Sequence, residues 1–237
     1  MTDDVDRLAR ERLAADEARI TGFSRRRGLT LGQAWRAFWH HPSPWLIATF
    51  LLASVVGRVV VGPGSWWELL IPVVLLALFP AIEWVIHVGI LHWRPRRVGP
   101  VEIDSLLARK HREHHADPRD LPLVFIPWPV LTWLLPAYVA VVLLAVPSAS
   151  AAWSLLVSVY AVMFGYEWTH YLIHSDHRPR TRAYRAVWRN HRLHHYKNEH
   201  YWFTVTSAGT ADRLFGTYPD PDTVPTSPTA KNLHGAA

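Results

Sequence analysis

Histidine is the residue type whose number and spacing in this sequence point most clearly to chemistry. The chain has 15 histidines among 237 residues, and ten of them fall into four short groups. Two groups have the pattern His-x2-His-His, which places three imidazoles on one face of a helix because positions i, i+3 and i+4 lie on the same side. A third group, His-x3-His, also shares a helical face. The histidines of the fourth are five residues apart, so one of them should lie where the helix bends or ends. The ten residues are His87 and His92; His111, His114 and His115; His170 and His174; and His191, His194 and His195.

This number of imidazoles indicates a site for more than one metal ion. A structural zinc ion takes four ligands and a catalytic one takes three plus water, so two ions with five or six nitrogen ligands each would use all ten. Imidazole binds iron, zinc, copper and nickel, so the ligand type does not select the metal. The absence of cysteine excludes cysteine-ligated zinc, iron–sulfur clusters and thiol catalysis. The sequence also lacks His-Glu-x-x-His, which disfavours a zincin protease.

Two acidic residues lie on the same helical faces as these histidines, within apolar segments. Glu83 is four residues before His87, and Glu167 is three residues before His170. A charge in such a segment is costly, which marks it as a functional candidate. We expect both carboxylates to accept a hydrogen bond from the second ring nitrogen of a metal ligand. The alternative is an ion pair between helices, for example with Arg58.

Apolar segments of membrane-spanning length position these side chains. Half of the chain is hydrophobic and only 19% is charged, which argues against a soluble protein. Residues 121–166 contain no charged residue and no histidine. As one helix they would be about 69 Å long, roughly twice a hydrocarbon core of about 30 Å. They should therefore fold back into two spans, about 124–146 and 151–172. Residues 44–61 and 66–91 form another pair, so the sequence predicts two helical hairpins.

Basic residues are concentrated on one side of this arrangement. Of the 25 lysines and arginines, 24 lie before the first span, between the hairpins or after the last span. By the positive-inside rule these segments face the cytoplasm, and the net charge of +6 then fits an anionic membrane surface rather than nucleic acid. Span lengths put all four histidine groups at this same face. The excess of arginine over lysine, with abundant alanine, proline and tryptophan, is typical of a GC-rich bacterial genome, so we expect an integral protein of the bacterial cell membrane.

The predicted fold is all-α, with four transmembrane helices in two hairpins and a cytoplasmic helical cap that holds a histidine-rich dimetal site. Residues 1–43 are expected to form a cytoplasmic N-terminal segment, 44–218 a membrane-embedded domain, and 219–237 a disordered C-terminal tail in which His234 is exposed.

Other residues near the membrane face are weaker candidates for the site. His177 and His200 lie close to the main groups and are possible additions to them. Arg94, Arg96 and Arg97 are candidates to contact a lipid head group or carboxylate, with ordinary positive-inside charge as the alternative. Five aromatic residues are candidates to line a substrate mouth: Phe125, Trp128, Tyr171, Tyr201 and Trp202.

The segments that carry the histidines resemble the fatty acid hydroxylase superfamily of membrane di-iron enzymes, which includes sterol desaturases and carotenoid hydroxylases. Within it, the sequence is most similar to fatty acid and sphingolipid 2-hydroxylases, over about residues 80–218. Two departures from the family pattern concern the substrate mouth. Thr204 stands where the family usually has glycine, and Ile126 and Trp128 interrupt a Leu-Val-Phe-Pro-Pro segment. The matching segments are 83–92, 111–115, 120–129, 166–174, 191–196, 203–207 and 212–217.

The resemblance implies an oxygenase that hydroxylates an unactivated C–H bond of a lipid, with 2-hydroxylation of a fatty acyl chain as the favoured reaction. It implies two iron ions held by the ten histidines, O2 as co-substrate and two electrons. Zinc can replace the irons in purified samples. Because the chain has no cysteine cluster and no flavin or nicotinamide fingerprint, the electrons should come from an external donor. A ferredoxin or cytochrome b5-like protein docking on the basic face would fit this role.

Two alternatives remain open on the sequence. One is sterol- or carotenoid-type hydroxylation or desaturation on the same scaffold, which the mass of the product would distinguish. The other is a membrane metal carrier of a different class. A carrier should have ligands along a path through the membrane, whereas the histidine groups are predicted at one face.

Overall fold

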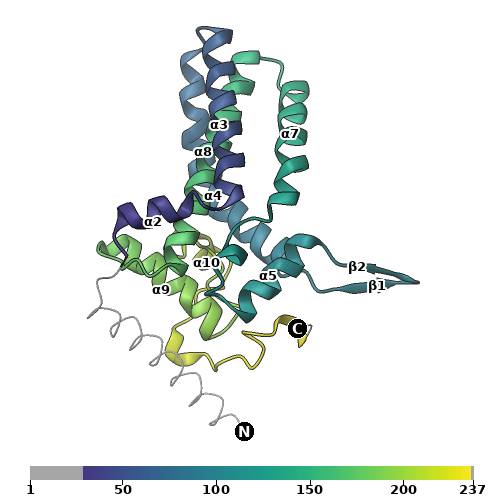
Figure 1. Ribbon diagram of the computed structural model, residues 1–237, viewed down its shortest axis with the longest axis vertical. Coiled ribbons are helices and arrows are strands. Elements are labelled where there is room, and N and C mark those ends of the chain that lie inside the picture. Colours follow the sequence, from purple (N-terminus) through teal and green to yellow (C-terminus); the bar gives the residue numbers. More distant parts are fainter. Residues whose placement is uncertain (1–28, 236–237) are drawn as a thin grey trace.

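The computed structural model describes residues 29–235, so most of the predicted N-terminal segment 1–43 lies outside the described residues (Figure 1). Four helical segments are long and apolar enough to cross a membrane, as the sequence predicted. They are α3 (Pro42–Val61); Trp66–Leu91, made of η1 (Trp66–Leu69), α4 (Leu70–Ile86) and the π-helical turn η2 (His87–Leu91); Leu121–Ala145, made of α6 (Leu121–Val124) and α7 (Trp128–Ala145); and α8 (Ala149–His174).

Three of the four spans, α3, α7 and α8, pack around a small apolar core, and most of the other side chains of the spans face outward. Ile47, Leu131, Leu135, Leu156 and Tyr160 are buried together between α3, α7 and α8. The Tyr160 hydroxyl donates a hydrogen bond to the Leu135 carbonyl at 2.9 Å. The outward apolar side chains would be costly in water, but they match a hydrocarbon environment.

Polar side chains join the spans at the end of the bundle where α3 leads into α4. Arg58 donates to Ser154 at 2.8 Å and pairs with Glu68 at 3.2 Å. Ser150 also donates to Glu68, at 2.7 Å. Arg58 therefore has its acidic partner in Glu68, and the alternative of an ion pair with Glu83 or Glu167 is wrong.

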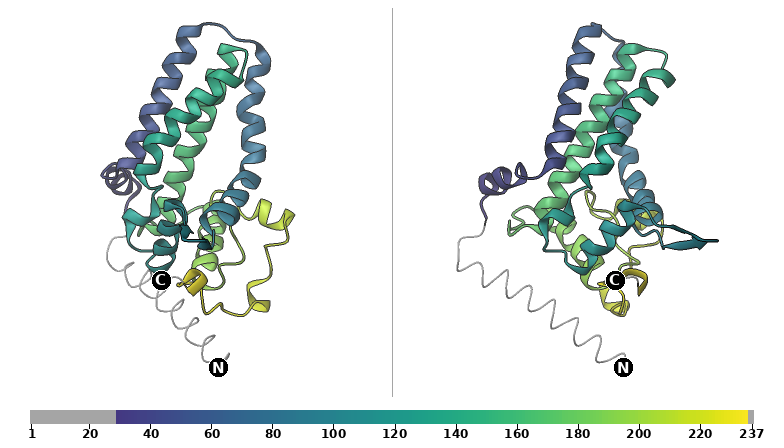
Figure 2. Two further views of the ribbon diagram at one scale, coloured as in Figure 1. Left: turned by 90° about the vertical axis from the view of Figure 1, so that its right-hand side faces the viewer. Right: turned by 45° about the vertical axis from the view of Figure 1, so that its right-hand side comes forward.

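The remaining elements form a cap at the opposite end of the bundle (Figures 1 and 2). Ser105 and Thr181 cap the N-termini of its two main helices by accepting bonds from the backbone N–H groups of Ala108 and Tyr184, at 3.1 and 3.2 Å. The cap brings together two stretches of chain that are far apart in sequence, at the end of the spans opposite the turn between α3 and α4. Its elements are β1 (Arg96–Val98), β2 (Val101–Ile103), α5 (Leu106–Ala116), α9 (Arg182–Tyr196), α10 (Thr210–Leu214), η3 (Pro221–Thr223) and η4 (Leu233–Gly235), with α2 (Leu31–Phe38) beside the bundle.

The C-terminal segment, which we define as residues 219–235, packs against this cap. Val224, Ala230 and Leu233 are buried. The Ser227 backbone N–H donates to the Lys197 carbonyl at 2.8 Å. The prediction of a disordered tail is therefore wrong for these residues, because three buried apolar side chains and a backbone hydrogen bond hold a segment whose composition is polar.

Candidate metal centre

The structure brings the ten clustered histidines together under the spans and divides them into two groups of five. Within each group, one ring nitrogen per residue lies within 4.8 Å of all the others. Group A consists of His87, His92, His111, His115 and His194, and group B consists of His114, His170, His174, His191 and His195.

Each His-x2-His-His motif serves both groups. On α5, His111 and His115 belong to group A and His114 to group B. On α9 the assignment is reversed, since His194 alone belongs to group A. The two cap helices therefore hold the groups side by side, an arrangement that spacing on a single helix does not reveal.

A π-helical turn explains the unusual spacing of His87 and His92. The backbone N–H of His92 donates to the His87 carbonyl at 2.9 Å, which is an i to i+5 bond. Residues five apart diverge by about 140° on an α-helix, whereas the wider π turn brings them closer to one face. Their ring centroids lie 5.0 Å apart. The turn is the local departure from α-helix that the spacing predicted.

The separations between ring nitrogens fit shared metal ions. In group B, Nε2 of His191 lies 3.0 Å from Nε2 of His170, of His174 and of His195. One N–H cannot donate to three acceptors, so hydrogen bonds alone do not satisfy this cluster. Two nitrogens bound to one ion at about 2.1 Å would be about 3.0 to 3.4 Å apart. The corresponding separations in group A are 3.1 to 3.2 Å.

Burial keeps these imidazoles in the form that binds metal. Loss of hydration, followed by repulsion from neighbouring histidines, holds the pKa of His111 and His195 well below the usual value of 6.5. Burial likewise lowers the pKa of His194 to about 3. The rings are therefore neutral near pH 7, and a neutral ring has a nitrogen lone pair available to a cation.

Backbone carbonyls orient the rings of group A. Nδ1 of His87 lies 2.6 Å from the Phe203 carbonyl, and Nδ1 of His194 lies 2.8 Å from the Tyr201 carbonyl. Nδ1 of His115 lies 3.0 Å from the carbonyl of Ala230. A carbonyl at Nδ1 makes that nitrogen the protonated one and leaves Nε2 free to bind a metal.

Group B lacks such partners for most of its rings. Among the described residues, Nδ1 of His114, His191 and His195 is buried with no hydrogen-bond partner, and so is Nε2 of His114. Three continuous helices, α5, α8 and α9, carry all five residues. Helix packing therefore positions most of group B, and His170 and His174 also contact backbone carbonyls, those of Val124 and Pro118.

Within residues 29–235, Glu83 and Glu167 make no hydrogen bond to a histidine ring, so the expectation that they accept ring N–H bonds is wrong. Glu83 accepts from the backbone N–H of Val205 at 2.7 Å and from the Thr206 hydroxyl at 2.9 Å. Glu167 accepts from the Ser43 hydroxyl and from the backbone N–H of Ile126 at 3.1 Å. Glu167 instead joins α8 to the first turn of α3 and to the junction between α6 and α7. Glu83 holds the loop 205–206 to α4, and this loop follows Phe203, whose carbonyl contacts group A.

Asp212 organises the same loop, a role that the sequence did not reveal. Its buried carboxylate accepts from the backbone N–H groups of Phe203 and Thr204, at 2.8 and 3.0 Å, and from the Thr204 hydroxyl at 2.5 Å. The Thr217 hydroxyl donates to it as well, at 2.8 Å. Thr204, which departs from the family pattern, is thus accommodated by a hydrogen bond to Asp212.

The three remaining histidines near the cap lie outside both groups. His177 contacts the Leu29 carbonyl at 3.0 Å, and His200 is exposed beside Glu199, at 3.5 Å. His234 was expected to be exposed, but it is half-buried and its Nε2 lies 2.9 Å from the carbonyl of His92. It therefore contacts the backbone of a group A residue rather than solvent alone.

The five predicted mouth residues do not form one cluster. Phe125 and Tyr171 are buried against each other, with ring centroids 5.5 Å apart, and they pack with α2. Tyr201 and Trp202 form a second pair at 5.7 Å, and among the described residues no ring contact joins the two pairs. Trp128 is exposed at the start of α7. Their shared role at a substrate mouth stays a prediction.

Comparisons with known proteins agree with this architecture. A sequence model of the fatty acid hydroxylase family matches residues 72–217, which is more than half of the chain. The chain therefore belongs to the fatty acid hydroxylase family. Among solved structures it is similar to full-length Scs7p, in which only the hydroxylase domain is visible. The TM-score is 0.62 and the identity 22%, over 78% of this chain and 70% of that chain. No curated protein matches the sequence.

Family membership and the site together define the class of protein. The chain is a lipid hydroxylase, and therefore an oxidoreductase, with four membrane-spanning helices and a histidine-rich cluster suited to metal ions. The Scs7p likeness shows that the fold is shared.

Proposed function

We propose that this protein is a di-iron oxygenase that hydroxylates C2 of a fatty acyl chain, using O2 and two external electrons. The observation that carries the proposal is the convergence of ten buried imidazoles into two groups of five, in a chain of the fatty acid hydroxylase family. Ten neutral nitrogen ligands without cysteine or carboxylate fit iron, although zinc binds the same donors. In the proposal, group A and group B hold one iron each.

The two irons, when bound, supply the activation of O2 that hydroxylation of an unactivated C–H bond needs. The chain would position the two ions and exclude bulk water from the site. Helices α5 and α9 each carry ligands of both groups, so they fix the distance between the ions. Glu83 and Asp212 close the loop 203–206 over group A, and the burial of the rings keeps bulk water away from the site.

A lipid is the substrate class that the location of the site supports best. Four of the histidines lie at the ends of two spans, His87 and His92 at η2 and His170 and His174 at the end of α8, so an acyl chain held among the spans would have its head group at the membrane interface. Trp128 is exposed and is the first residue of α7, so we assign it to the mouth. Phe125, Tyr171, Tyr201 and Trp202 would act deeper, as parts of the wall.

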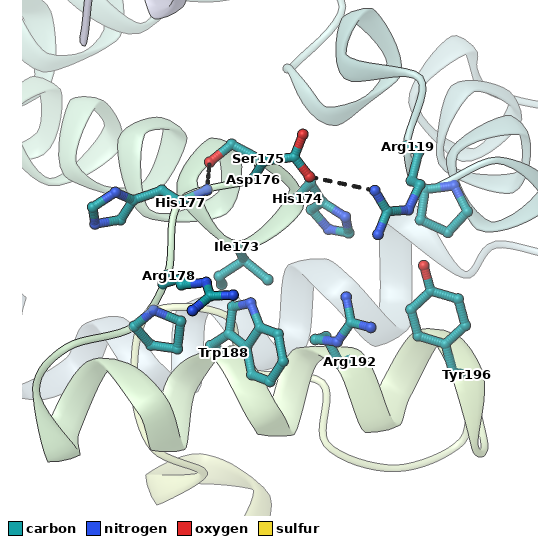
Figure 3. Close-up of a pocket in the computed structure, with 12 residues that line it drawn as sticks. Arg119, Ile173, His174, Ser175, Asp176, His177, Arg178, Trp188, Arg192 and Tyr196 are labelled. Atoms are coloured by element: carbon teal, nitrogen blue, oxygen red, sulfur yellow. Dashed lines mark hydrogen bonds and ion pairs between the residues drawn. The ribbon is translucent and has the colours of Figure 1, made fainter. Parts of the chain in front are cut away.

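The electron donor would dock on the basic side of the cap. Figure 3 shows a pocket between the end of α8 and α9 that is lined by Arg119, Arg178 and Arg192 and also by His174 of group B. Asp176, 3.5 Å from Arg119, is the acidic residue in its lining. This charge favours an acidic carrier such as a ferredoxin, or a cytochrome b5-like protein. Increasing salt should lower the rate of electron transfer.

Orientation and source are parts of the proposal. The concentration of basic residues at the cap end supports a cap facing the cytoplasm, and the composition supports a bacterial cell membrane. In this arrangement residues 44–218 form the catalytic domain, while 1–43 precede it on the cytoplasmic side.

The decisive experiment is expression of the chain in a host without 2-hydroxy fatty acids, followed by mass spectrometry of its hydrolysed lipids. The matched variant is His114→Ala with His115→Ala, which removes one ligand from each group. His200→Ala, at an exposed histidine outside both groups, is the control. We expect a 2-hydroxy fatty acid with the wild type and the control and none with the double variant. Full activity of the double variant would contradict the proposal.

The product also separates the alternatives. A sterol or carotenoid that gains one oxygen atom, or a lipid that loses two hydrogen atoms, would replace acyl 2-hydroxylation by the related chemistry on the same scaffold. A metal carrier is disfavoured because both groups lie at one end of the bundle (Figure 1). Metal uptake into sealed vesicles without any oxidised lipid would restore that alternative.

A further inference from the structure

A two-stranded hairpin extends sideways from the cap, away from the axis of the bundle (Figures 1 and 2). It begins five residues after the span that ends at Leu91. Its strands, β1 and β2, are joined by a two-residue turn in which Gly99 has φ +61°, a conformation that tight hairpin turns need. The hairpin therefore follows closely after the end of a candidate span.

The register gives the hairpin two chemically different faces. Directly opposed residues point to the same side of a sheet, and successive residues point to opposite sides. Arg96, Val98, Val101 and Ile103 thus share one face, which is apolar except for Arg96 at its edge, and Arg97 and Glu102 share the other. The three cross-strand pairs are Arg96 with Ile103, Arg97 with Glu102, and Val98 with Val101.

The apolar face has no cover within the part of the chain that the structure describes. Val98 is 62% exposed, Val101 58% and Ile103 45%. All six strand residues are exposed. Because an isolated two-stranded hairpin is only marginally stable in water, a second surface is needed to support it.

We propose that this hairpin lies on the membrane, with its apolar face at the boundary between head groups and acyl chains and its arginines at anionic head groups. The four candidate spans would place a membrane next to the hairpin. Arg94, Arg96 and Arg97 outnumber the single acid Glu102, which favours an anionic lipid surface. The Arg96 guanidinium lies 4.8 Å from the centre of the Trp93 ring, so a cation and an aromatic ring border the apolar face, as is typical of interfacial segments.

The absence of cysteine from the chain allows a direct test. Single cysteines are introduced at Val98 or Val101 on the apolar face, and at Arg97 or Glu102 on the opposite face. Each is labelled with bimane in the full-length protein, reconstituted in bilayers that contain anionic lipid. Quenching is then measured with brominated acyl chains and with aqueous iodide.

Labels at 98 and 101 should be quenched several-fold more by brominated lipid than labels at 97 and 102, with the reverse order for iodide. Replacing the anionic lipid by neutral lipid should reduce the difference. Equal iodide quenching on both faces would overturn the proposal in favour of a solvated hairpin. Protection of 98 and 101 from both quenchers would overturn it in favour of a protein partner or second copy. Neither outcome depends on the proposed enzyme activity.

A second observation concerns the C-terminal segment, residues 219–235, which begins after the end of the family match at 217. Its Ala230 carbonyl lies 3.0 Å from Nδ1 of His115, and Nε2 of its His234 lies 2.9 Å from the carbonyl of His92. The buried Glu199 anchors the segment by accepting from Ser227 at 2.9 Å and Thr229 at 2.5 Å. Both histidines that it contacts belong to group A.

We infer that the C-terminal segment positions the ligands of group A and so retains the metal there, an inference that rests on the proposed metal site. Thr229→Val removes one anchor to Glu199. Thr223→Ala is the matched control, because the Thr223 hydroxyl donates within the segment, to the Asp220 carbonyl at 2.8 Å. A chain ending after Tyr218 removes the segment altogether.

The measurement is the metal content per chain during dialysis against a chelator. Thr229→Val should lose one of two ions at least several-fold faster than the wild type, the shortened chain should keep only one, and Thr223→Ala should match the wild type. Wild-type retention in both Thr229→Val and the shortened chain would overturn the inference. Failure of the wild type itself to bind two ions would instead overturn the proposed function.

Discussion

The two histidine groups have the same number of ligands but are held in different ways. Group B is carried by three continuous helices, and in the part of the chain that the structure describes Nδ1 of three of its rings has no hydrogen-bond partner. Group A takes two ligands from a π turn and its end, and its rings contact carbonyls of the loop 201–203 and of the C-terminal segment. Group B therefore depends on the packing of the bundle, whereas group A depends on loops that must fold around it.

This difference predicts separate sensitivities. A change in the bundle should affect group B and the overall stability together. A change in the loop 201–217 or in residues 219–235 should affect group A alone. Because orienting contacts to metal ligands alter affinity by about 10- to 100-fold, the two sites can be distinguished by metal content.

The largest effect is expected from removal of a central ligand. His191→Ala deletes the ring whose Nε2 lies 3.0 Å from three others in group B, and His111→Ala deletes the ring that joins His87 and His115 in group A. Each should reduce product to the detection limit, because the reaction needs both ions. The measurement is 2-hydroxy fatty acid per chain, with His200→Ala as the control. Substantial turnover in either variant would show that one group suffices.

Metal removal should act on the two groups in sequence. During chelation of the wild type, one ion per chain should leave first, from group A, because local opening of its loops exposes it. The second should leave only as the bundle loosens. Metal content followed with time should show two phases that differ by about tenfold or more in rate. Release of both ions in a single kinetic phase would contradict the claim that the two groups are held in different ways.

Loss of the loop carboxylate should have the next largest effect. The carboxylate of Asp212 accepts four hydrogen bonds with its two oxygens. In Asp212→Asn one oxygen is replaced by an NH₂ group, which cannot accept, so some of these donors lose their acceptor. We expect about 10- to 100-fold weaker metal binding in group A, with group B unchanged. Titration of the metal-free protein with iron measures both affinities. Equal weakening at both sites would mean that Asp212 supports the whole cap.

The smallest effect on metal is expected at Glu167. This buried carboxylate joins α8 to Ser43 and Ile126, and it does not contact a histidine ring. Glu167→Gln should lower the free energy of unfolding by about 1 to 3 kcal/mol while leaving two ions per chain. Thermal unfolding and metal content of the same sample test this. Selective loss of the group B ion would instead show that Glu167 supports metal binding in group B.

Much of the fold was predictable from composition and spacing. The charge-free run 121–166 is too long for one span and predicted two, the segments 44–61 and 66–91 predicted another two, and four spans are confirmed. The His-x2-His-His patterns correctly selected residues that converge in space. How α5 and α9 divide their histidines between the groups was not predictable, because it depends on the relative rotation of two packed helices.

The errors have physical causes as well. Glu83 and Glu167 share helical faces with ligands, but their carboxylates reach backbone N–H groups of distant loops, which no local spacing reveals. The segment 219–235 has a polar, proline-containing composition, yet Val224, Ala230 and Leu233 fasten it to the cap. Contacts between segments far apart in sequence decided both cases.

The most direct test of the central claim is the metal count of the iron-loaded wild type beside His115→Ala and His195→Ala, which remove one ligand from group A and one from group B. Elemental analysis of the purified protein should give two iron ions per wild-type chain. Each variant should retain about one, and the remaining ion should be released quickly by chelator in His195→Ala and slowly in His115→Ala. A single ion in the wild type, or an unchanged count in either variant, would contradict a centre built from two five-histidine groups.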